Sequence, residues 1–136
     1  MNKNEIVLEL TNFFSQKPQF DTILLFGSFA DGKNRPDSDA DIAVHTDKRL
    51  SLDEILDMQT ELTLLLHIDV DLVDLRQCEG VFLHEIMCNN IRIRYNHDTY
   101  HYYLMKSLIF MEDEYPIIRR LQREKLRRYL NEPINA

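Results

Sequence analysis

Glycine and proline are scarce in this sequence, and no segment has a biased composition. Its 136 residues include three glycines and four prolines, and no repeat or low-complexity stretch is visible. These scarcities exclude collagen-like, disordered and repeat architectures. With 44% hydrophobic residues, the chain is long enough for one packed domain and too short for two substantial ones.

Cysteine pairs and long apolar runs are also lacking. Cys78 and Cys88 lie ten residues apart without CxxC spacing, which favours free thiols over a disulfide framework or a zinc site. The longest uncharged stretch, Thr22 to Ala30, is far shorter than the roughly 20 residues that span a bilayer. The residues after Met1 form no long apolar run either. We therefore expect a cytoplasmic protein.

The excess of acidic residues limits the partners that this chain can bind. The formal net charge is −7, and residues 1–80 carry 16 acidic and 7 basic side chains. A stand-alone nucleic-acid-binding protein normally has a large basic surface, which this composition disfavours. An acidic enzyme that binds a triphosphate needs cations to mask its own field, so metal dependence is expected.

Helical and strand-like hydrophobic patterns alternate along the chain, which predicts an α/β (α+β) domain. The predicted elements, in order, are a helix over residues 4–16, strands over Thr22–Phe26 and Ala40–Thr46, a helix opened by the Ser51–Glu54 capping box and ending near His67, a strand over Ile68–Leu75, a short helix over Val81–Cys88, an edge strand over Ile91–Tyr95, and one or two helices from about Asp98 to Leu130 with a break near Pro116. The helix after Ser51 is expected to pack through one apolar face, formed by Leu52, Ile55, Leu56, Leu62, Leu65 and Leu66.

A glycine–serine pair follows the first predicted strand. Gly27 and Ser28 open what we interpret as a single helical turn, where backbone N–H groups and the Ser28 hydroxyl are available to a phosphate. Glycine lets such a phosphate approach the backbone closely. Alone, the pair is usually just a turn.

Paired carboxylates follow ten residues later. Asp39 and Asp41 share one face of a strand because strand side chains alternate with period two. Like charges at this spacing raise each other's proton affinity unless a cation lies between them. Taken by itself, such a pair is more often a turn acid followed by a solvated strand-edge acid.

A third carboxylate, Asp71, lies in a strand rich in aliphatic residues. If this strand lies beside the strand that carries Asp39 and Asp41, three carboxylates converge into an oxygen-donor set that suits Mg²⁺ or Mn²⁺ rather than zinc. Asp69 shares the face of Asp71 and is the reserve candidate, whereas Asp74 has the opposite parity and is expected to be solvated.

The spacing of these groups resembles the signature of the DNA polymerase β superfamily, specifically its minimal nucleotidyltransferase (MNT) domains. The resemblance consists of Gly27-Ser28, then Asp39-x-Asp41, then Val70-Asp71-Leu72-Val73 after a helix. It is close over about residues 20–75 and loose elsewhere, and its elements together are far more specific than any one alone. It implies a small mixed β-sheet flanked by helices, with a helical C-terminal tail.

The resemblance also implies roles for these residues. Gly27 and Ser28 would hold the triphosphate of ATP. Asp39 and Asp41 would bind two Mg²⁺ ions, with Mn²⁺ as a possible substitute, and Asp71 would complete the metal site nearest the attacking group.

One position in the phosphate loop departs from the family pattern. Asp31 stands where many relatives have arginine. A basic triphosphate contact is therefore in doubt at this position, and Lys33 and Arg35 in the same loop are the candidates to replace it.

A protein acceptor is implied as well. Small MNT proteins commonly form the antitoxin half of toxin–antitoxin pairs whose toxin is a HEPN ribonuclease, and the resemblance implies AMP transfer from ATP to a tyrosine hydroxyl of that cognate toxin. The chain has no room for a separate acceptor-binding domain, which favours a macromolecular acceptor that docks over the site. Two alternatives stay open: an MNT antitoxin without activity that inhibits by binding alone, and a nucleotidyltransferase that modifies a small molecule or an RNA end.

The domain expected from the resemblance covers residues 1–96, and residues 97–136 are expected to form a helical extension packed on it. The segment from Arg119 to Arg128 carries six basic residues and one acidic residue. A solvated helix face is the first interpretation, followed by docking onto an acidic surface of the toxin and then by contact with nucleic acid.

Overall fold

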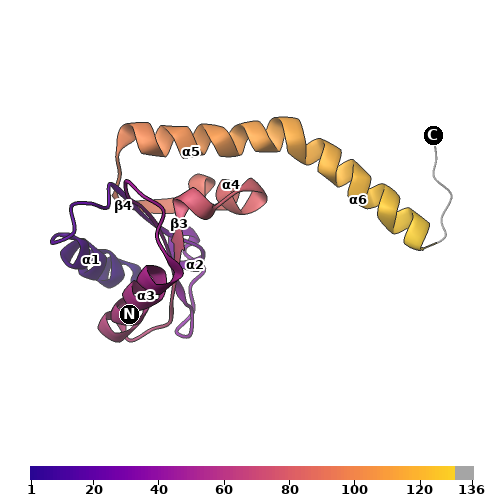
Figure 1. Ribbon diagram of the computed structural model, residues 1–136. Coiled ribbons are helices and arrows are strands. Elements are labelled where there is room, and N and C mark those ends of the chain that lie inside the picture. Colours follow the sequence, from indigo (N-terminus) through magenta and orange to yellow (C-terminus); the bar gives the residue numbers. More distant parts are fainter. Residues whose placement is uncertain (131–136) are drawn as a thin grey trace.

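The computed structural model describes residues 1–130 and shows a four-stranded sheet between two layers of helices (Figure 1). In chain order the elements are α1 (Lys3–Phe14), β1 (Thr22–Phe26), α2 (Ser28–Asp31), β2 (Ala40–His45), α3 (Leu52–Leu66), β3 (Val70–Asp74), a 3-10 turn η1 (Leu75–Gln77), α4 (Gly80–Cys88), β4 (Asn90–Arg94), α5 (His97–Ile109), a π-helical segment η2 (Phe110–Glu114) and α6 (Tyr115–Tyr129). The expected fold class and element order are confirmed. The part of the predicted extension at residues 131–136 lies outside the described residues.

The sheet is mixed, with strand order β3-β2-β1-β4. Strand β1 pairs antiparallel with β2 and with β4, whereas β2 and β3 pair parallel. Parallel neighbours need a crossover connection, which α3 supplies. Strand β4 lies at the edge of the sheet, as its sequence predicts.

The two faces of the sheet are covered by different helices. One core joins α1 and α3 to alternate strand residues, and its largest buried members include Ile6, Leu10, Phe14, Ile23, Leu25, Ile42, Leu62 and Leu66. The other core joins α4 and α5 to the opposite face and contains Leu24, Phe26, Ala43, Leu83, Ile86, Met87 and Tyr103. Because Ala43 points to the α4 face, Asp41, two residues earlier on β2, belongs to that face as well.

Helix α3 begins at the predicted capping box but packs through a narrower face than its sequence indicates. The Ser51 hydroxyl accepts the Glu54 N–H at 3.1 Å and donates to the Glu54 carboxylate at 3.2 Å. Leu62 and Leu66 are buried, with Ile55 and Met58 partly buried beside them. The expected burial of three further leucines is wrong, since the exposed set includes Leu52, Leu56 and Leu65.

Asp74 is buried, and the prediction that it is solvated is wrong. Its side chain is 2% exposed. Its carboxylate accepts the backbone N–H of Leu50 at 2.9 Å and that of Arg76 at 3.0 Å. The opposite parity to Asp71 is correct, but on that side the acid meets the loop before α3 rather than water. Asp74 therefore anchors the end of β3.

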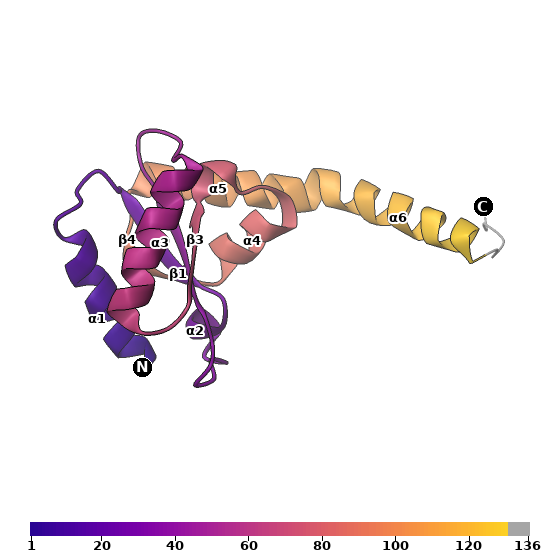
Figure 2. The same ribbon diagram turned by 60° about the horizontal axis from the view of Figure 1, so that its bottom comes forward.

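The C-terminal helices form a long arm. Helix α5 packs on α4 through Tyr103 and Ser107, which are buried. After η2, helix α6 extends away from the rest of the molecule in both views (Figures 1 and 2). Pro116 lies in the first turn of α6, where proline is compatible with a helix. Across residues 1–130, no helix combines the length and apolarity needed to cross a membrane.

Both cysteines are free thiols, as predicted, with Cys78 buried and Cys88 exposed.

Replacing Asp74 with alanine should leave two backbone N–H groups near Leu50 and Arg76 without acceptors. We expect Asp74→Ala to lower the free energy of unfolding by about 1–3 kcal/mol in a urea titration. The exposed Asp69→Ala change should stay within about 0.5 kcal/mol of the unmodified chain. Equal stabilities for the two variants would contradict the anchoring role of Asp74.

Candidate active site

The turn after β1 places the backbone against a carboxylate. Gly27 has a φ of +74°, a conformation that side chains with a Cβ rarely adopt, and Ser28 begins the four-residue helix α2. A Cβ on Gly27 would overlap the Oδ2 atom of Asp41 and lie 3.1 Å from its Cγ. Glycine is therefore required at this position for both its φ and the space that Asp41 occupies.

Strand pairing brings two of the predicted acids side by side. Strands β2 and β3 are adjacent and parallel, and their register pairs Asp41 with Asp71. Both side chains point to the α4 face, because the residues flanking them, Ile42 and Leu72, belong to the core on the other face. The conditional prediction that these strands are neighbours is confirmed.

The crowding of carboxylates perturbs the ionisation of Asp41. Its partial burial raises its pKa from 3.8 to about 6, and the negative charges of Asp71 and Asp39 add to the shift. A hydrogen bond between the Asp41 and Asp71 carboxyl groups acts in the same direction and requires a proton on one of them. The site therefore favours any positive charge placed between these groups.

A cavity of about 810 Å³ contains this carboxylate pair. Its lining includes Gly27, Asp41 and Asp71 from the turn and sheet, and Phe82, His84 and Glu85 from α4. The remaining lining residues are Phe26, Asp31, Gln59, Leu72, Val73, Cys88 and Asn89. The ring of Phe82 packs edge-on against Phe26 with centroids 5.9 Å apart. Turn, sheet and helix thus form one open cavity, in which the carboxylates lie beside an aromatic wall.

The other predicted site residues lie outside this cavity. Asp39 is exposed just before β2 and lines a separate hollow that also contains Asp69. Lys33 and Arg35 are exposed in the loop after α2 and do not line the cavity. Within residues 1–130, no group of three or more His, Cys, Asp or Glu side chains is arranged as a metal site. The side chains thus bring Asp41 and Asp71 together but do not gather all three acids around one point.

Sequence reasoning missed several residues of the cavity. Gln59 on α3 accepts the backbone N–H of Leu72 at 3.0 Å and so holds β3 next to Asp71. Phe82 and Glu85 are exposed residues of α4, and no motif in the sequence signalled them. Asp31, the departure from the family pattern, faces the cavity and adds another negative charge.

The residues present fit a divalent cation in their chemistry. Asp41 and Asp71 supply hard oxygen donors of the kind that Mg²⁺ and Mn²⁺ prefer. Burial and then the charges of Asp71 and Asp39 raise the pKa of Asp41, and a bound cation would offset the repulsion between these charges. Asp39, two residues before Asp41, is the nearest further acid whose charge Asp41 senses.

A hollow of about 940 Å³ lies between α4 and the arm, and it is larger than the carboxylate cavity. Its lining is mainly apolar and contains no adjacent pair of aspartates. We place the chemistry in the smaller cavity, because that is where the perturbed carboxylate lies.

Comparison with known proteins gives consistent results. A family model described as "Polymerase beta, Nucleotidyltransferase" matches residues 9–99. The protein adenylyltransferase MntA of Shewanella oneidensis is 33% identical to the chain over 87 residues, which are 64% of this chain and 60% of that protein. This chain therefore matches less than two thirds of the length of that curated relative.

Solved structures resemble nearly the whole chain. A chain in a toxin–antitoxin crystal structure with AMP-PNP has a TM-score of 0.66 and 26% identity, covering 96% of this chain and 95% of its own. A chain in the structure of the tri-AMPylated S. oneidensis HEPN toxin with its MNT antitoxin has a TM-score of 0.60 and 25% identity, covering 95% and 92%.

The raised pKa of Asp41 predicts a pH-dependent stability. The folded state binds the Asp41 proton more tightly than the unfolded chain, so its contribution is complete below about pH 4 and is lost as the pH rises to about 6. In buffer with a chelator, Asp41→Asn should therefore melt at a higher temperature than the unmodified chain at about pH 8 and at a similar temperature near pH 4. A difference that is the same at both pH values would show that carboxylate repulsion is not its cause.

Proposed function

Because this chain belongs to the polymerase β nucleotidyltransferase family, we propose that it transfers AMP from ATP to a tyrosine hydroxyl of a cognate HEPN ribonuclease toxin and thereby neutralises that toxin. The observation that carries this proposal is the pairing of Asp41 with Asp71 beside the Gly27 turn, inside a cavity large enough for a nucleotide. Nothing in this arrangement requires a covalent intermediate with the protein.

The relatives support both the donor and the acceptor. MntA of S. oneidensis is a protein adenylyltransferase, and one of the similar structures contains an AMPylated HEPN toxin. Another contains an ATP analogue. These properties belong to the relatives, and their transfer to this chain rests on the family and on the carboxylate pair.

The reaction that we propose exchanges a phosphoanhydride bond of ATP for a phosphodiester bond to tyrosine. The tyrosine oxygen attacks the α-phosphorus of ATP, and the bond from that phosphorus to the bridging oxygen of the β-phosphate breaks. Pyrophosphate leaves, and the tyrosine proton passes to solvent. The products are an AMP–tyrosine phosphodiester and pyrophosphate.

Each predicted residue has a role in this scheme. Gly27 and Ser28 receive the triphosphate at the turn. Asp39, Asp41 and Asp71 would hold divalent cations, two Mg²⁺ ions or Mn²⁺ in their place, and Asp71 would complete the site on the side of the acceptor. Bound there, the cations would lower the pKa of the acceptor hydroxyl and neutralise the departing pyrophosphate.

Local electrostatics explain why this chain would depend on cations. Asp31 and Glu85 line the cavity together with the paired aspartates, while Lys33 and Arg35 lie outside it. A triphosphate entering this cavity meets negative charge from the protein, so its binding requires compensating positive charge. We assign Lys33 and Arg35 to the outer phosphates, which extend toward the loop after α2.

The domain division and the cellular location remain part of the proposal. We assign nucleotidyl transfer to residues 1–96 and a helical extension to residues 97–136. Two free thiols and an ATP-dependent reaction both favour the cytoplasm.

One observation favours inhibition by binding alone as the second candidate. Asp39 faces a different hollow from Asp41, and a chain that kept the fold but lost activity would tolerate such an arrangement. The two candidates differ in whether a covalent mark remains on the toxin after the antitoxin is removed.

Intact-mass analysis of the toxin tests the proposed transfer. After incubation with ATP, Mg²⁺ and this chain, the repurified HEPN protein should gain one or more AMP increments and lose ribonuclease activity. Asp39→Asn and Asp41→Asn should each abolish the increment, because each removes a proposed metal ligand. An unmodified toxin that is fully inhibited only while the complex persists would leave binding alone as the function.

The parity of β3 predicts which acid matters most there. Asp71→Asn should reduce the rate of AMP transfer by at least about 100-fold. Asp69→Asn should change the rate far less, because Asp69 precedes β3, lines the other hollow and, unlike Asp39, is not among the charges that raise the pKa of Asp41. Greater loss at Asp69 than at Asp71, measured in the same transfer assay, would assign the metal to that hollow instead.

A further inference from the structure

Within residues 1–130, helix α6 receives little tertiary support. None of its residues is buried, and in both views it projects beyond the rest of the molecule (Figures 1 and 2). An isolated helix of about 15 residues is only marginally stable in water, because most helix stability in proteins comes from packing an apolar face. A partner surface would supply the packing that this helix lacks.

The surface of α6 combines apolar and basic groups. Leu121 is 55% exposed and Leu126 is 56% exposed. The exposed apolar residues of this segment are Ile117, Ile118, Leu121, Leu126, Tyr129 and Leu130. Helix α6 also carries six of the 16 basic residues of the chain and one of its 23 acidic residues. Such a helix matches a partner with an apolar groove and acidic borders.

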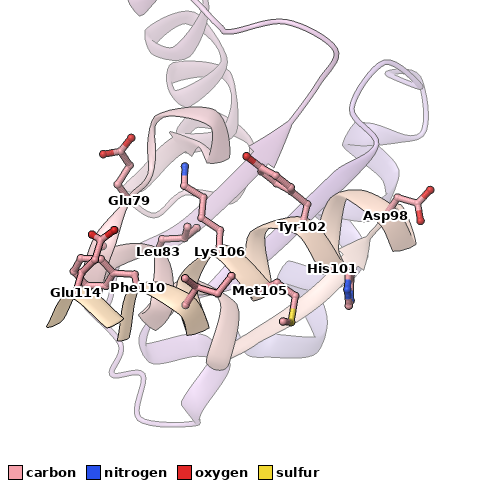
Figure 3. Close-up of a pocket in the computed structure, with 11 residues that line it drawn as sticks. Glu79, Leu83, Asp98, His101, Tyr102, Met105, Lys106, Phe110 and Glu114 are labelled. Atoms are coloured by element: carbon pink, nitrogen blue, oxygen red, sulfur yellow. The ribbon is translucent and has the colours of Figure 1, made fainter. Parts of the chain in front are cut away.

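The apolar hollow beside the arm continues this surface onto the domain. It lies between α4 and the helices α5 and η2 and has a volume of about 940 Å³. Leu83, Met105, Ile109 and Phe110 line it, and Glu79 and Glu114 are among its charged residues (Figure 3). Because η2 leads directly into α6, helix α6 begins at the edge of the hollow, next to Glu114.

Helix α4 separates this face from the active-site cavity. Leu83 lines the apolar hollow, whereas Phe82 and Glu85, next to it on the same helix, line the carboxylate cavity. A protein seated in the hollow would therefore lie one helix away from Asp41 and Asp71. That position suits an acceptor whose tyrosine must enter the cavity.

We propose that α6 and the apolar hollow together form the docking face for the acceptor protein. This inference rests on the proposed function, and it adds the surface through which the chain holds its substrate. The partner would insert an apolar ridge into the hollow and present acidic side chains to α6. The AMP-PNP toxin–antitoxin structure matches 96% of this chain, so the similarity to a chain crystallised with a toxin extends into α6.

Two other occupants fit the observations less well. A nucleic acid would be repelled by the acidic residues of the hollow and by the overall charge of −7. Two copies of this chain paired through α6 would place six basic residues against six. The acceptor protein is the occupant that explains why the face adjoins the active site.

Substitutions at exposed positions test the docking face without disturbing the core. Leu121→Glu changes α6, and Met105→Glu changes the lining of the hollow. Leu64→Glu is the control, because Leu64 is 71% exposed on α3 at the opposite face of the sheet. Affinity for the cognate HEPN protein is measured by surface plasmon resonance. Binding of AMP-PNP by calorimetry and melting temperature report on the active site and the fold.

We expect Leu121→Glu and Met105→Glu each to weaken the Kd at least about tenfold, as for residues central to an interface. The control should stay within about twofold, and AMP-PNP binding and melting temperature should be unchanged in all three. With saturating partner, the rate of AMP transfer should recover, because docking contributes to KM rather than to kcat.

Three results would overturn the proposal. The first is an unchanged Kd in both variants, and the second is an equal loss of affinity in the Leu64→Glu control. The third is a dimer of the isolated chain, seen by sedimentation velocity, that the Leu121→Glu substitution dissociates without weakening partner binding. If the chain binds the HEPN protein through this face but adds no AMP to it, the docking face is supported and the proposed transfer fails.

Discussion

Repulsion between neighbouring carboxylates is the constraint on which the rest of this site depends. Parallel pairing of β2 with β3 fixes Asp41 beside Asp71, and partial burial keeps water from screening them fully. Burial, followed by the charges of Asp71 and Asp39, raises the pKa of Asp41 to about 6. A chain that retains such a pair loses stability near neutral pH unless a cation compensates, so the arrangement is better explained by ligand binding than by folding.

One face of the sheet carries an acid that stabilises the fold, and the other carries the acids of the candidate active site. On the α1 and α3 face, Asp74 accepts two backbone N–H groups and secures the end of β3. On the α4 face, Asp41 and Asp71 line an open cavity. Because strand side chains alternate with a period of two, Asp71 and Asp74, three residues apart, point to opposite faces of the sheet. Asp74 anchors the loop before α3, and Asp71 lies in the active site.

Much of this arrangement could be predicted from residue spacing. The order of elements follows from local pattern, and resemblance supplied the proposed role of the Gly27 turn. The predicted shared face of Asp39 and Asp41 did not place both acids in one cavity. The adjacency of β2 and β3 could not be predicted from spacing, because strand order is a property of the whole fold. The prediction that Asp71 lies beside Asp41 therefore depended on that adjacency. The exposure of Leu52 and Leu56 was missed because a wide apolar stripe does not show which part of it the sheet covers.

Long-range contacts explain the other differences. The burial of Asp74 depends on the N–H of Leu50, 24 residues earlier, and no local pattern signals that partner. Phe82 and Glu85 belong to the cavity only because α4 packs on the sheet at a particular angle. Asp39 lies one residue before β2 begins and lines a separate hollow, although its parity matches that of Asp41.

The most direct test of the central claim is to measure which phosphate of ATP is transferred to the acceptor protein. With the cognate HEPN protein as acceptor, ATP radiolabelled at the α-phosphate should label that protein, and ATP radiolabelled at the γ-phosphate should not. Asp41→Asn should abolish the α-label. Transfer of the γ-label, or no labelling from either donor in an intact complex, would contradict nucleotidyl transfer by the site built around Asp41 and Asp71.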